Sequence, residues 1–549
     1  MDNKKLAELM FPNIDKDIEY YEQKYPNRNL PKGAIVTRFA PSPTGFVHMG
    51  SLRTAFIARK IATDTGGVFY LRIEDTDEKR SVENGIQGIV EDLENFNFII
   101  DEGRISETKD LGIYGPYLQS ERASIYKTFA KHLVEKGFAY PCFATEEELS
   151  KIRQFQESKK ERIGYYGLYA KSRNFEIKEI ESKILSGEKF VTRLKSPGNF
   201  SNKVICADLV KGKIEFPEND LDIVLLKSDG IPTYHFAHLV DDYLMRTTHI
   251  LRGDEWLSSY PVHEQLFKIF GYELPKYCHV APVNKKDGDS VRKLSKRHDP
   301  EAALSYYHEK GIPINAVYLY LMTTANSNFE EWLEQNPKSN LNDYKFEFKK
   351  MSASGSLFDL DKLINISKNY ISKLSAKEVY DEVINWTKIY DKEFYDILIN
   401  NKALSIDIFN IEREQKKPRK DFASWSEIKE NVFYMFDDYF DYKKVDFSLV
   451  NNPEKYKELI NLYIDKYYNE SDDKNTWFRK IKELSTELGY APEMNLYKEN
   501  PTKYKGNVAD VSNILRVALT TKTTTPDLYE IMRLLGKEKI AKRFNDLSK

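Results

Sequence analysis

Cysteine is scarce in this chain: the 549 residues include three, Cys142, Cys206 and Cys278. Three scattered cysteines cannot form a framework of disulfides, and they suit a reducing compartment, so we expect a cytoplasmic protein. Cys142 is followed at the next-but-one position by Ala144, where a zinc site would need a second thiolate. No set of four cysteines and histidines can be gathered nearby, so we expect no structural zinc and assign no metal-ligating residue.

Long hydrophobic runs are also missing. No stretch of about 18 uninterrupted apolar residues occurs, which predicts no membrane span, and the polar N-terminus Met1–Lys5 lacks the apolar segment of a secretion signal. No Gly-x-Gly-x-x-Gly follows a strand, which argues against a nicotinamide oxidoreductase. The net charge of −2 is not that of a uniformly basic nucleic-acid binder, although local basic patches can still contact RNA.

The first informative segment combines a strand, a loop and a helix. The apolar strand Ala34–Phe39 leads into Ala-Pro-Ser-Pro-Thr-Gly-Phe-Val-His-Met-Gly at 40–50, where two prolines end the strand. Apolar residues at helical spacing then predict a helix over about 50–64. The N-terminus of such a helix favours phosphate, because it offers unpaired N–H groups and the positive end of the helix dipole. His48 could donate to a phosphate oxygen there, and Gly50 would let an adenine approach the backbone.

The second informative segment is Lys-Leu-Ser-Lys-Arg at 293–297. It follows the polar stretch Asn284–Ser290, which we expect to form a flexible loop. The ammonium groups of Lys293 and Lys296 could reach charge that develops on phosphate oxygens only in a transition state. A solvated run of charges is the alternative interpretation of this segment when it is taken alone.

Together and in this order, the two segments resemble the two ATP-binding signatures of class I aminoacyl-tRNA synthetases. The wording Arg-Phe-Ala-Pro-Ser-Pro-Thr-Gly at 38–45 resembles bacterial members of the glutamyl-tRNA synthetase family, and the similarity extends from about residue 31 to the C-terminus. Two positions differ from the usual signatures: Ser51 stands where a second histidine is frequent, and Leu294 replaces a methionine. Serine can still form hydrogen bonds but cannot become cationic.

The resemblance implies a fold and a domain order. It implies an α/β multidomain protein: a Rossmann-like parallel-sheet catalytic domain with an inserted acceptor-end binding domain, followed by an all-α anticodon-binding region. The expected parts are an N-terminal extension at 1–30, the catalytic domain at 31–116 and 228–290, the insertion at 117–227, a stem-contact region with the lysine loop at 291–375, and a helical anticodon-binding domain at 376–549.

Periodicity gives the expected elements within these parts. We expect helices at about 83–95 and 120–136, and strands at about 68–74, 190–194 and 213–216. Strands at 223–226 and 249–252 are expected to resume the catalytic sheet.

The resemblance also implies the reaction. ATP, L-glutamate and tRNA(Glu) would give glutamyl-tRNA, AMP and pyrophosphate through a glutamyl-adenylate, with Mg²⁺ neutralising the phosphates. The attacking group is the carboxylate of the substrate itself, so the protein positions reactants and stabilises charge. We expect a monomer with no membrane partner.

The resemblance assigns catalytic roles to His48, Lys293 and Lys296. The ATP-binding set that it implies is Pro43, Thr44, Gly45, His48, Gly50, Ser51, Trp256, Leu294, Ser295 and Lys296.

A glutamate side chain needs a fixed cation, and the planar fork of an arginine matches a carboxylate. The resemblance places Arg38, Tyr234 and Arg252 around that side chain, whereas ordinary salt bridges are the alternative interpretation of the two arginines. The full glutamate-binding set is Arg38, Ala40, Ser42, Glu74, Tyr234, His238 and Arg252, with Glu74 on the α-ammonium and Ala40 and Ser42 on the substrate backbone.

In the helical C-terminal region, Lys417 and Arg419 are the candidates for contacting the anticodon. The aromatic residues Trp425 and Tyr434 could stack on bases, but aromatics at helical spacing are more often core.

Several other functions fit parts of the sequence. A truncated paralogue that modifies a tRNA base would lack the long helical C-terminal half, and a glutaminyl enzyme would carry Pro-Glu-Pro where this chain has Pro-Ser-Pro. A smaller nucleotidyltransferase would not need a distant lysine segment. A catalytically inactive RNA-binding regulator is disfavoured by the intact His48, Lys293 and Lys296.

Overall fold

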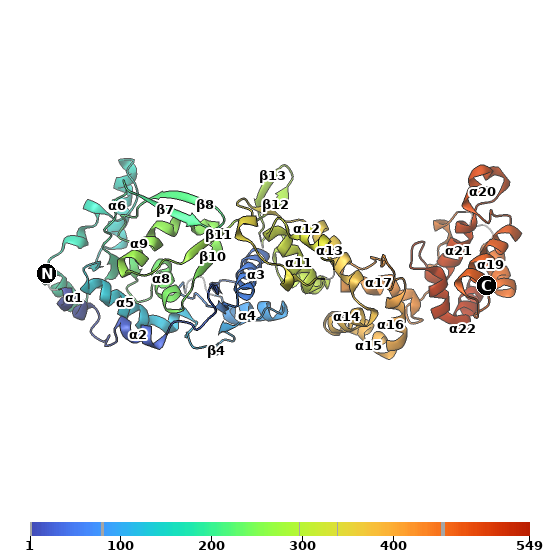
Figure 1. Cartoon of the computed structure of the whole chain (residues 1–549), viewed down its shortest axis with the longest axis horizontal. Helices are drawn as coiled ribbons and strands as arrows, with labels where there is room; N and C mark the ends of the chain where they lie inside the picture. Colours follow the sequence, from blue (N-terminus) through green and yellow to red (C-terminus); the bar gives the residue numbers. More distant parts are fainter. Residues whose placement is uncertain (1–2, 78–81, 296, 338, 452–455, 549) are drawn as a thin grey trace. The chain divides into compact units, whose positions relative to one another are not determined.

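The computed structural model describes the whole chain except residues 1–2, 78–81, 296, 338, 452–455 and 549. It forms two compact units (Figure 1). The first contains Met1–Tyr306 and Tyr318–Asp359, and the second contains Tyr307–Val317 and Leu360–Lys549. No helix among the described residues has both the length and the hydropathy needed to cross a membrane.

The first unit is built on parallel strands. β1 (Val36–Phe39) pairs in parallel with β2 (Val68–Leu71), and β2 pairs in parallel with β3 (Glu102–Arg104). On the other side of β1 lies the parallel pair of β10 (His249–Gly253) and β11 (Lys276–Val280). The backbone N–H of Thr248 donates to the carbonyl of Val36 at 3.1 Å and joins the two sets. The sheet continues from β3 to the antiparallel strand β4 (Asp110–Leu111).

Helices connect and cover these strands where the sequence predicts them. α3 (Met49–Asp64) follows β1 and packs against β1 and β2. α4 (Gly85–Asn95) and α5 (Ala123–Glu135, preceded by a 3₁₀ turn at Gln119–Arg122) match the predicted helical segments. The expected Rossmann-like arrangement is therefore confirmed.

The segment between the two parallel halves forms its own antiparallel sheet. β5 (Ala139–Cys142), β6 (Val191–Leu194) and β9 (Val224–Leu226) are neighbours in that order. We expected the strand at 223–226 to resume the catalytic sheet, and this was wrong, because β9 pairs with β6. A short apolar strand shows its own conformation but not its partner. The segment also contains α6 (Glu146–Ser158), α7 (Ile177–Leu185) and a hairpin of β7 (Lys203–Asp208) with β8 (Gly212–Pro217).

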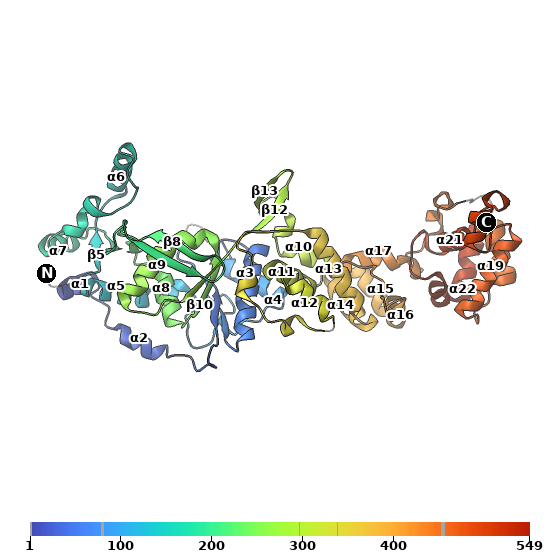
Figure 2. The same ribbon diagram turned by 45° about the horizontal axis from the view of Figure 1, so that its top comes forward.

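The polar stretch before the lysine motif is a β-hairpin, so the expectation of a flexible loop was wrong. β12 (Val283–Asp287) pairs antiparallel with β13 (Ser290–Lys293), and β12 also pairs with β14 (Ser356–Leu357). The hairpin stands out from the body of the first unit in both views (Figures 1 and 2). Asp287 pairs with Ser290, so the two-residue turn is Gly288-Asp289, and Gly288 at φ +60° takes the first central position, which favours glycine.

The N-terminal extension is part of the core of the first unit. α1 (Asn3–Met10) and α2 (Ile18–Lys24) bury Leu6 and Tyr21 in a hydrophobic cluster that includes Phe129 of α5. The same cluster contains residues of α8 (Tyr234–Leu244) and α9 (Tyr260–Phe270). The remaining helices before residue 360 are α10 (Ser305–Lys310), α11 (Ile314–Ala325) and α12 (Phe329–Gln335).

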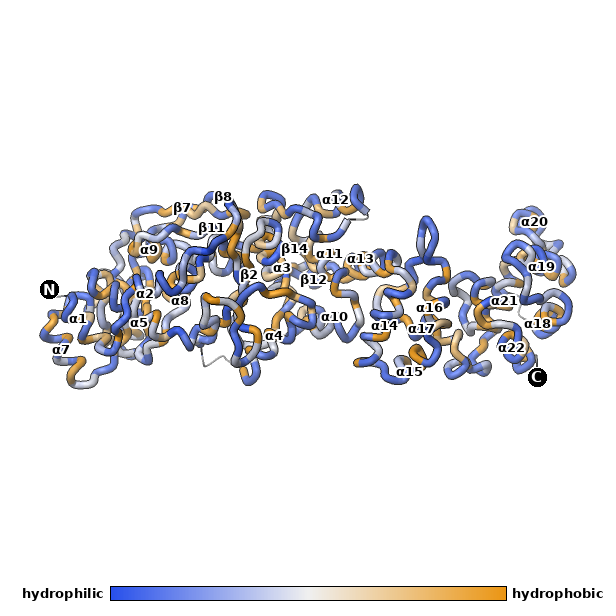
Figure 3. The backbone as a smooth tube through the Cα atoms, turned by 60° about the horizontal axis from the view of Figure 1, so that its bottom comes forward, coloured by the Kyte–Doolittle hydropathy of each residue, from blue (hydrophilic) through white to orange (hydrophobic). Residues whose placement is uncertain are grey.

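The second unit is helical throughout its described part. Hydrophobic and hydrophilic stretches alternate along its helices (Figure 3), as expected for segments that bury one face. Its α-helices are α13 (Leu360–Lys373), α14 (Ala376–Tyr390), α15 (Lys392–Asn400), α16 (Lys402–Asn410), α17 (Ile428–Val432), α18 (Tyr456–Leu462), α19 (Lys474–Glu487), α20 (Met494–Glu499), α21 (Val508–Thr520) and α22 (Leu528–Ser548, kinked at Gly536).

A buried network of ion pairs joins the elements of the first unit. Asp241 of α8 accepts hydrogen bonds from Arg122 Nε at 2.7 Å, from Gln119 Nε2 at 2.8 Å and from the hydroxyl of Tyr126 at 2.8 Å. Its neighbour Asp242 pairs with arginines of β1 and of the segment that follows β2. Both aspartates are fully buried, so each is stabilised only while its hydrogen-bonding partners are in place.

We predict that Asp241→Asn destabilises the first unit by about 3–5 kcal/mol, because it leaves the buried guanidinium of Arg122 without an anion. The matched control is Glu215→Gln, which removes an exposed ion pair with Lys203 and should cost at most about 1 kcal/mol. Calorimetric unfolding of both variants measures the difference. Equal unfolding midpoints for the two variants would show that the network does not hold the unit together.

Candidate active site

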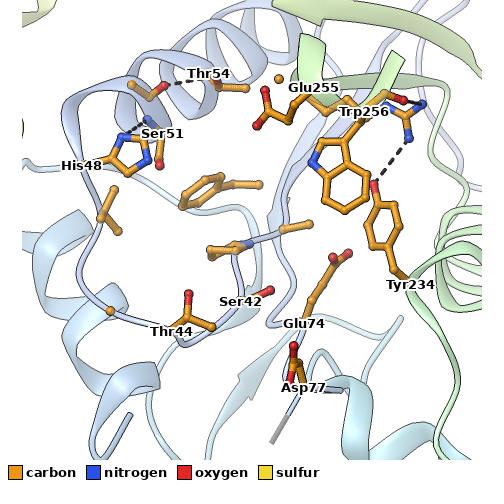
Figure 4. A pocket seen from close by; sticks show the side chains of 18 of the residues that line it. Ser42, Thr44, His48, Ser51, Thr54, Glu74, Asp77, Tyr234, Glu255 and Trp256 are labelled. Carbon is orange, nitrogen blue, oxygen red and sulfur yellow. Dashed lines mark hydrogen bonds between the residues drawn. The ribbon is translucent and has the colours of Figure 1, made fainter. Parts of the chain in front are cut away.

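A cavity of about 1310 Å³ in the first unit opens at the carboxyl ends of β1, β10 and β11. Ligands of open parallel sheets bind at this edge. The structure brings most of the predicted site residues into this one pocket (Figure 4). Those that line it are Arg38, Ala40, Ser42, Thr44, Gly45, His48, Gly50, Ser51, Glu74, Tyr234, Arg252, Trp256, Lys293, Leu294 and Ser295.

Two residues of the predicted ATP and glutamate sets are described but do not line this pocket. Pro43 is buried, and its carbonyl accepts the backbone N–H of Val82 at 3.0 Å. His238 is buried beneath the pocket wall. Lys296 lies outside the described residues.

His48 caps the N-terminus of α3. Its Nδ1 accepts the backbone N–H of Ser51 at 3.1 Å (Figure 4). A backbone N–H can only donate, so Nδ1 carries no proton and the proton of the neutral ring is on Nε2. A Cβ added at Gly50 would lie 3.1 Å from the imidazole, which explains why this position suits glycine. The capping bond thus makes Nε2 the nitrogen that donates. A histidine that binds a phosphate oxygen needs such a donor.

The two motifs meet in space. His48 forms an isolated antiparallel β-bridge with Ala303, which follows the lysine motif. The loop that carries His48 is held from its other side by α4, because the N–H of Val47 donates to Asp92 at 2.8 Å. Segments about 250 residues apart therefore form one wall of the pocket.

Asp299 organises the lysine segment. Its carboxylate accepts two hydrogen bonds from the guanidinium of Arg292, at 2.6 and 2.8 Å, and one from the backbone N–H of Ser295 at 2.9 Å. Lys285 of β12 lies 3.1 Å away. The bidentate bond from Arg292 is the main reason why the pKa of Asp299 lies well below its usual range. Sequence reasoning missed this residue, although an aspartate soon after a basic motif was the visible signal.

The two arginines predicted to bind the substrate differ in their partners. Arg38 is 4% exposed and forms a bidentate pair with Asp242, at 3.0 and 3.4 Å. Arg252 is 6% exposed and, among the described residues, forms no direct ion pair with a carboxylate. The charge of Arg38 is thus compensated within the protein, and that of Arg252 is the better placed to attract an anion.

Tyr234, Trp256 and Glu74 line the pocket near Arg252 (Figure 4). The rings of Tyr234 and Trp256 lie 4.1 Å apart, and the tyrosine hydroxyl accepts a hydrogen bond from Arg252 at 3.4 Å. Glu74 accepts from Arg72 at 2.9 Å. Burial raises the pKa of Glu74 above its usual value, although Arg72 and Arg38 oppose the shift. A cation bound here would further favour its ionised form.

His238 does not reach the pocket surface. Its Nε2 lies 3.0 Å from the hydroxyl of Tyr277, and its Nδ1 lies 2.8 Å from Asp242. Burial lowers the pKa of His238 to about 3, so the ring is neutral at physiological pH. One helical turn after Tyr234, it lies on the same face of α8, and its ring stacks beside that of Tyr234 with the ring centroids 5.9 Å apart.

Several pocket-forming residues were not predicted. Asp242 anchors Arg38, and Arg72 bridges Asp242 and Glu74. The signal was two successive aspartates in an otherwise apolar helix, which is a pattern that demands buried partners. Thr54, Asp77, Lys227 and Glu255 also line the pocket, but nothing in their sequence context distinguishes them from surface residues.

Comparison with known families decides the identity. Residues 34–364 match the catalytic domain model of the class I tRNA synthetases for E and Q, and residues 417–547 match an anticodon binding domain. The chain belongs to the class I tRNA synthetases of the E and Q group. The resemblance inferred from the two motifs is confirmed, and so is the fold class of a Rossmann-like catalytic domain followed by a helical region.

Individual synthetases of this group align with the whole chain. Glutamate–tRNA ligase of Clostridium perfringens (strain SM101 / Type A) is 50% identical over 547 residues, covering 99% of each chain. That of Acetivibrio thermocellus is 48% identical over 549 residues, covering all of both. The crystal structure of a glutamate tRNA ligase from Elizabethkingia meningosepticum in complex with its amino acid superposes with a TM-score of 0.73 at 26% identity, covering 93% of this chain and 98% of that one.

The predicted anticodon candidates of this synthetase lie in the second unit. Lys417 is exposed, and Arg419 pairs with Glu412 and Asp421 beside a small cavity of about 150 Å³. Trp425 and Tyr434 are buried in the helical core, which confirms that these aromatics are structural.

We predict that Asp299→Asn loosens the β12–β13 hairpin of this synthetase. Loss of hydrogen bonds to a charged group should speed amide hydrogen exchange at Ser295 and along β13 by about 10- to 150-fold. The control is Asp289→Asn, which changes an exposed carboxylate in the hairpin turn. If both variants exchange at the wild-type rate, Asp299 does not hold the segment.

Proposed function

We propose that the chain is a glutamate–tRNA ligase that activates L-glutamate with ATP and transfers it from glutamyl-adenylate to the 3′ end of tRNA(Glu). The observation that carries the proposal is the arrangement of one pocket with two ends. A capped helix N-terminus and the lysine segment form one end. The other is formed by a buried arginine that has no carboxylate partner among the described residues. The full-length identity with glutamate–tRNA ligases supports the same assignment.

At the ATP end, the Nε2–H of His48 and the N-terminus of α3 would bind phosphate oxygens. Lys293 and Lys296 would stabilise negative charge on the departing pyrophosphate. ATP enters as its Mg²⁺ complex, which lowers the charge that the protein must offset. The glutamate α-carboxylate attacks the α-phosphate, so no protein nucleophile is needed.

At the amino-acid end, Arg252 would bind the side-chain carboxylate and Tyr234 would pack beside it. Glu74 would accept the α-ammonium group, and Ala40 and Ser42 would contact the substrate backbone. A neutral glutamine side chain would leave the guanidinium without an anion, and this is the basis of discrimination. Arg38 is already paired with Asp242. Its guanidinium would therefore contact the substrate side chain by hydrogen bonding and would not add an uncompensated positive charge.

The other assignments follow from the family and remain proposals. Lys417 and Arg419 would contact the anticodon, and the segment 117–227 would bind the acceptor end. We propose that the enzyme acts as a monomer in the cytoplasm.

We predict that the purified protein catalyses ATP–pyrophosphate exchange with L-glutamate and not with L-glutamine, and that the exchange depends on tRNA. Lys296→Ala should reduce the rate by about 100- to 1,000-fold, because it removes a donor to charge that develops in the transition state. Tight tRNA binding without exchange for either amino acid would instead identify an inactive RNA-binding relative.

We predict that Arg252→Gln raises the KM for glutamate by about 10- to 150-fold, because a hydrogen-bonded charge partner is lost. The KM for ATP should stay at the wild-type value, since the lysine segment is intact. Arg59→Gln, which changes a half-buried arginine of α3 outside the pocket lining, serves as the matched control. An unchanged KM for glutamate in Arg252→Gln would remove this residue from the binding site.

A further inference from the structure

Four of the nine histidines gather around Arg252: His235, His238, His263 and His279. Two of them contact the guanidinium directly. Arg252 Nε donates to Nε2 of His279 at 2.9 Å, and Arg252 NH1 lies 3.0 Å from Nδ1 of His263. Its other partners are also neutral: the carbonyl of Trp256 at 3.2 Å and the hydroxyl of Tyr234 at 3.4 Å.

The hydrogen bonds fix the protonation of both rings. A guanidinium has only donors, so the two nitrogens that face Arg252 must accept and carry no proton. Each neutral ring then has its single proton on the opposite nitrogen. That proton is also used: Nδ1 of His279 donates to Asp208 at 2.7 Å, and Nε2 of His263 donates to Nδ1 of His235 at 3.0 Å. Both histidines are therefore neutral for a geometric reason.

The surroundings keep them neutral. His263 and His279 are fully buried, and burial is the first cause of the lowered pKa of each. Burial also lowers the pKa of His235 to about 4, with the nearby Arg252 as the second cause. Protonation of either contacting ring would place two like charges about 3 Å apart, which is strongly unfavourable in a buried site.

One carboxylate of this region, Asp208, reaches Arg252 through a histidine ring. Asp208 ends β7, accepts the backbone N–H groups of Val210, Lys211 and His279, and reaches Arg252 only through the imidazole of His279. Asp208, Cys206 and His279 together have the composition of a metal site. The Asp208 carboxylate and the His279 ring are already hydrogen-bonded to each other and lie next to a guanidinium, and burial raises the pKa of the Cys206 thiol to about 12. This composition does not favour a metal cation.

Arg38 and Arg252 differ in the charge of the groups that hold them. Arg38 donates to a carboxylate and is compensated, whereas Arg252 is oriented by acceptors that carry no charge. We propose that His263 and His279 are specificity-determining positioning residues, which hold Arg252 in place while leaving its positive charge for the substrate carboxylate. The inference rests on the proposed function, since it names the groups that make the same pocket selective for an anionic side chain.

Three substitutions at one position test this. His263→Gln keeps a neutral acceptor, His263→Met removes the acceptor without adding charge, and His263→Glu supplies a carboxylate that can pair with Arg252. The readouts are the KM for glutamate, the KM for ATP, and the inhibition constant of L-glutamine as a competitor in aminoacylation. The outer control is His132→Gln, a half-buried histidine on α5 outside the pocket lining.

We expect His263→Gln to retain the wild-type constants within a few-fold. His263→Glu should raise the KM for glutamate by about 10- to 150-fold, because the arginine becomes compensated. The KM for ATP and the inhibition constant of L-glutamine should remain unchanged, since neither ligand uses the charge of Arg252. A purely structural role would move all three constants together.

The comparison of His263→Gln with His263→Met still tests the proposal if His263→Glu fails to fold. Recovery of glutamate affinity by Gln but not by Met supports the proposal. Equal constants for Gln and Met, or a wild-type KM for glutamate in a folded His263→Glu, would overturn it. Failure of the proposed function has a different signature, because the unmodified protein would then attach no glutamate to tRNA.

Discussion

The first unit depends on two successive carboxylates in the middle of α8. Asp241 faces the start of α5 and binds Arg122, and Asp242 faces the parallel sheet and binds Arg38 and Arg72. Adjacent side chains on a helix point in directions about 100° apart, so one helix can bind two different layers. Removing one partner of such a buried pair is far more costly than removing an exposed one. The direction of β1 relative to α8, and hence the mouth of the pocket, is set by these bonds.

The buried arginines of the first unit differ in whether a carboxylate compensates their charge. Arg38 and Arg72 are paired, and Arg252 is solvated by imidazoles, a hydroxyl and a carbonyl. Burial of a charge without a counter-ion is costly and is tolerated only when hydrogen bonds replace water. The described partners of Arg252 are neutral, so its positive charge can still attract an anionic ligand. A site selective for a carboxylate requires this condition, and an already paired arginine would not provide it.

Local chemistry decided which features could be predicted from the sequence. The strand, proline-containing loop and helix around His48 depend on residues within a few positions of one another, and the structure places them as expected. The hairpin before Lys293 also had a local signal, Gly288 at the position of its two-residue turn, but the polar residues around it suggested a loop instead. By contrast, the partner of β9 and the bonds of Asp242 and His279 join residues tens to hundreds of positions apart. No periodicity or spacing encodes such pairs, because they arise only when separate elements pack.

This difference explains why one end of the pocket was easier to predict from the sequence than the other. The proposed ATP end consists of two short motifs, which can be recognised from the sequence because they occur together and in a fixed order. The amino-acid end requires β10 for Arg252, α9 for His263, β11 for His279 and β7 for Asp208. One of these, β7, belongs to the segment inserted between the parallel halves. The orientation of Arg252 is therefore a property of the parallel sheet and the inserted segment together, so neither part alone contains all the residues of the proposed amino-acid site.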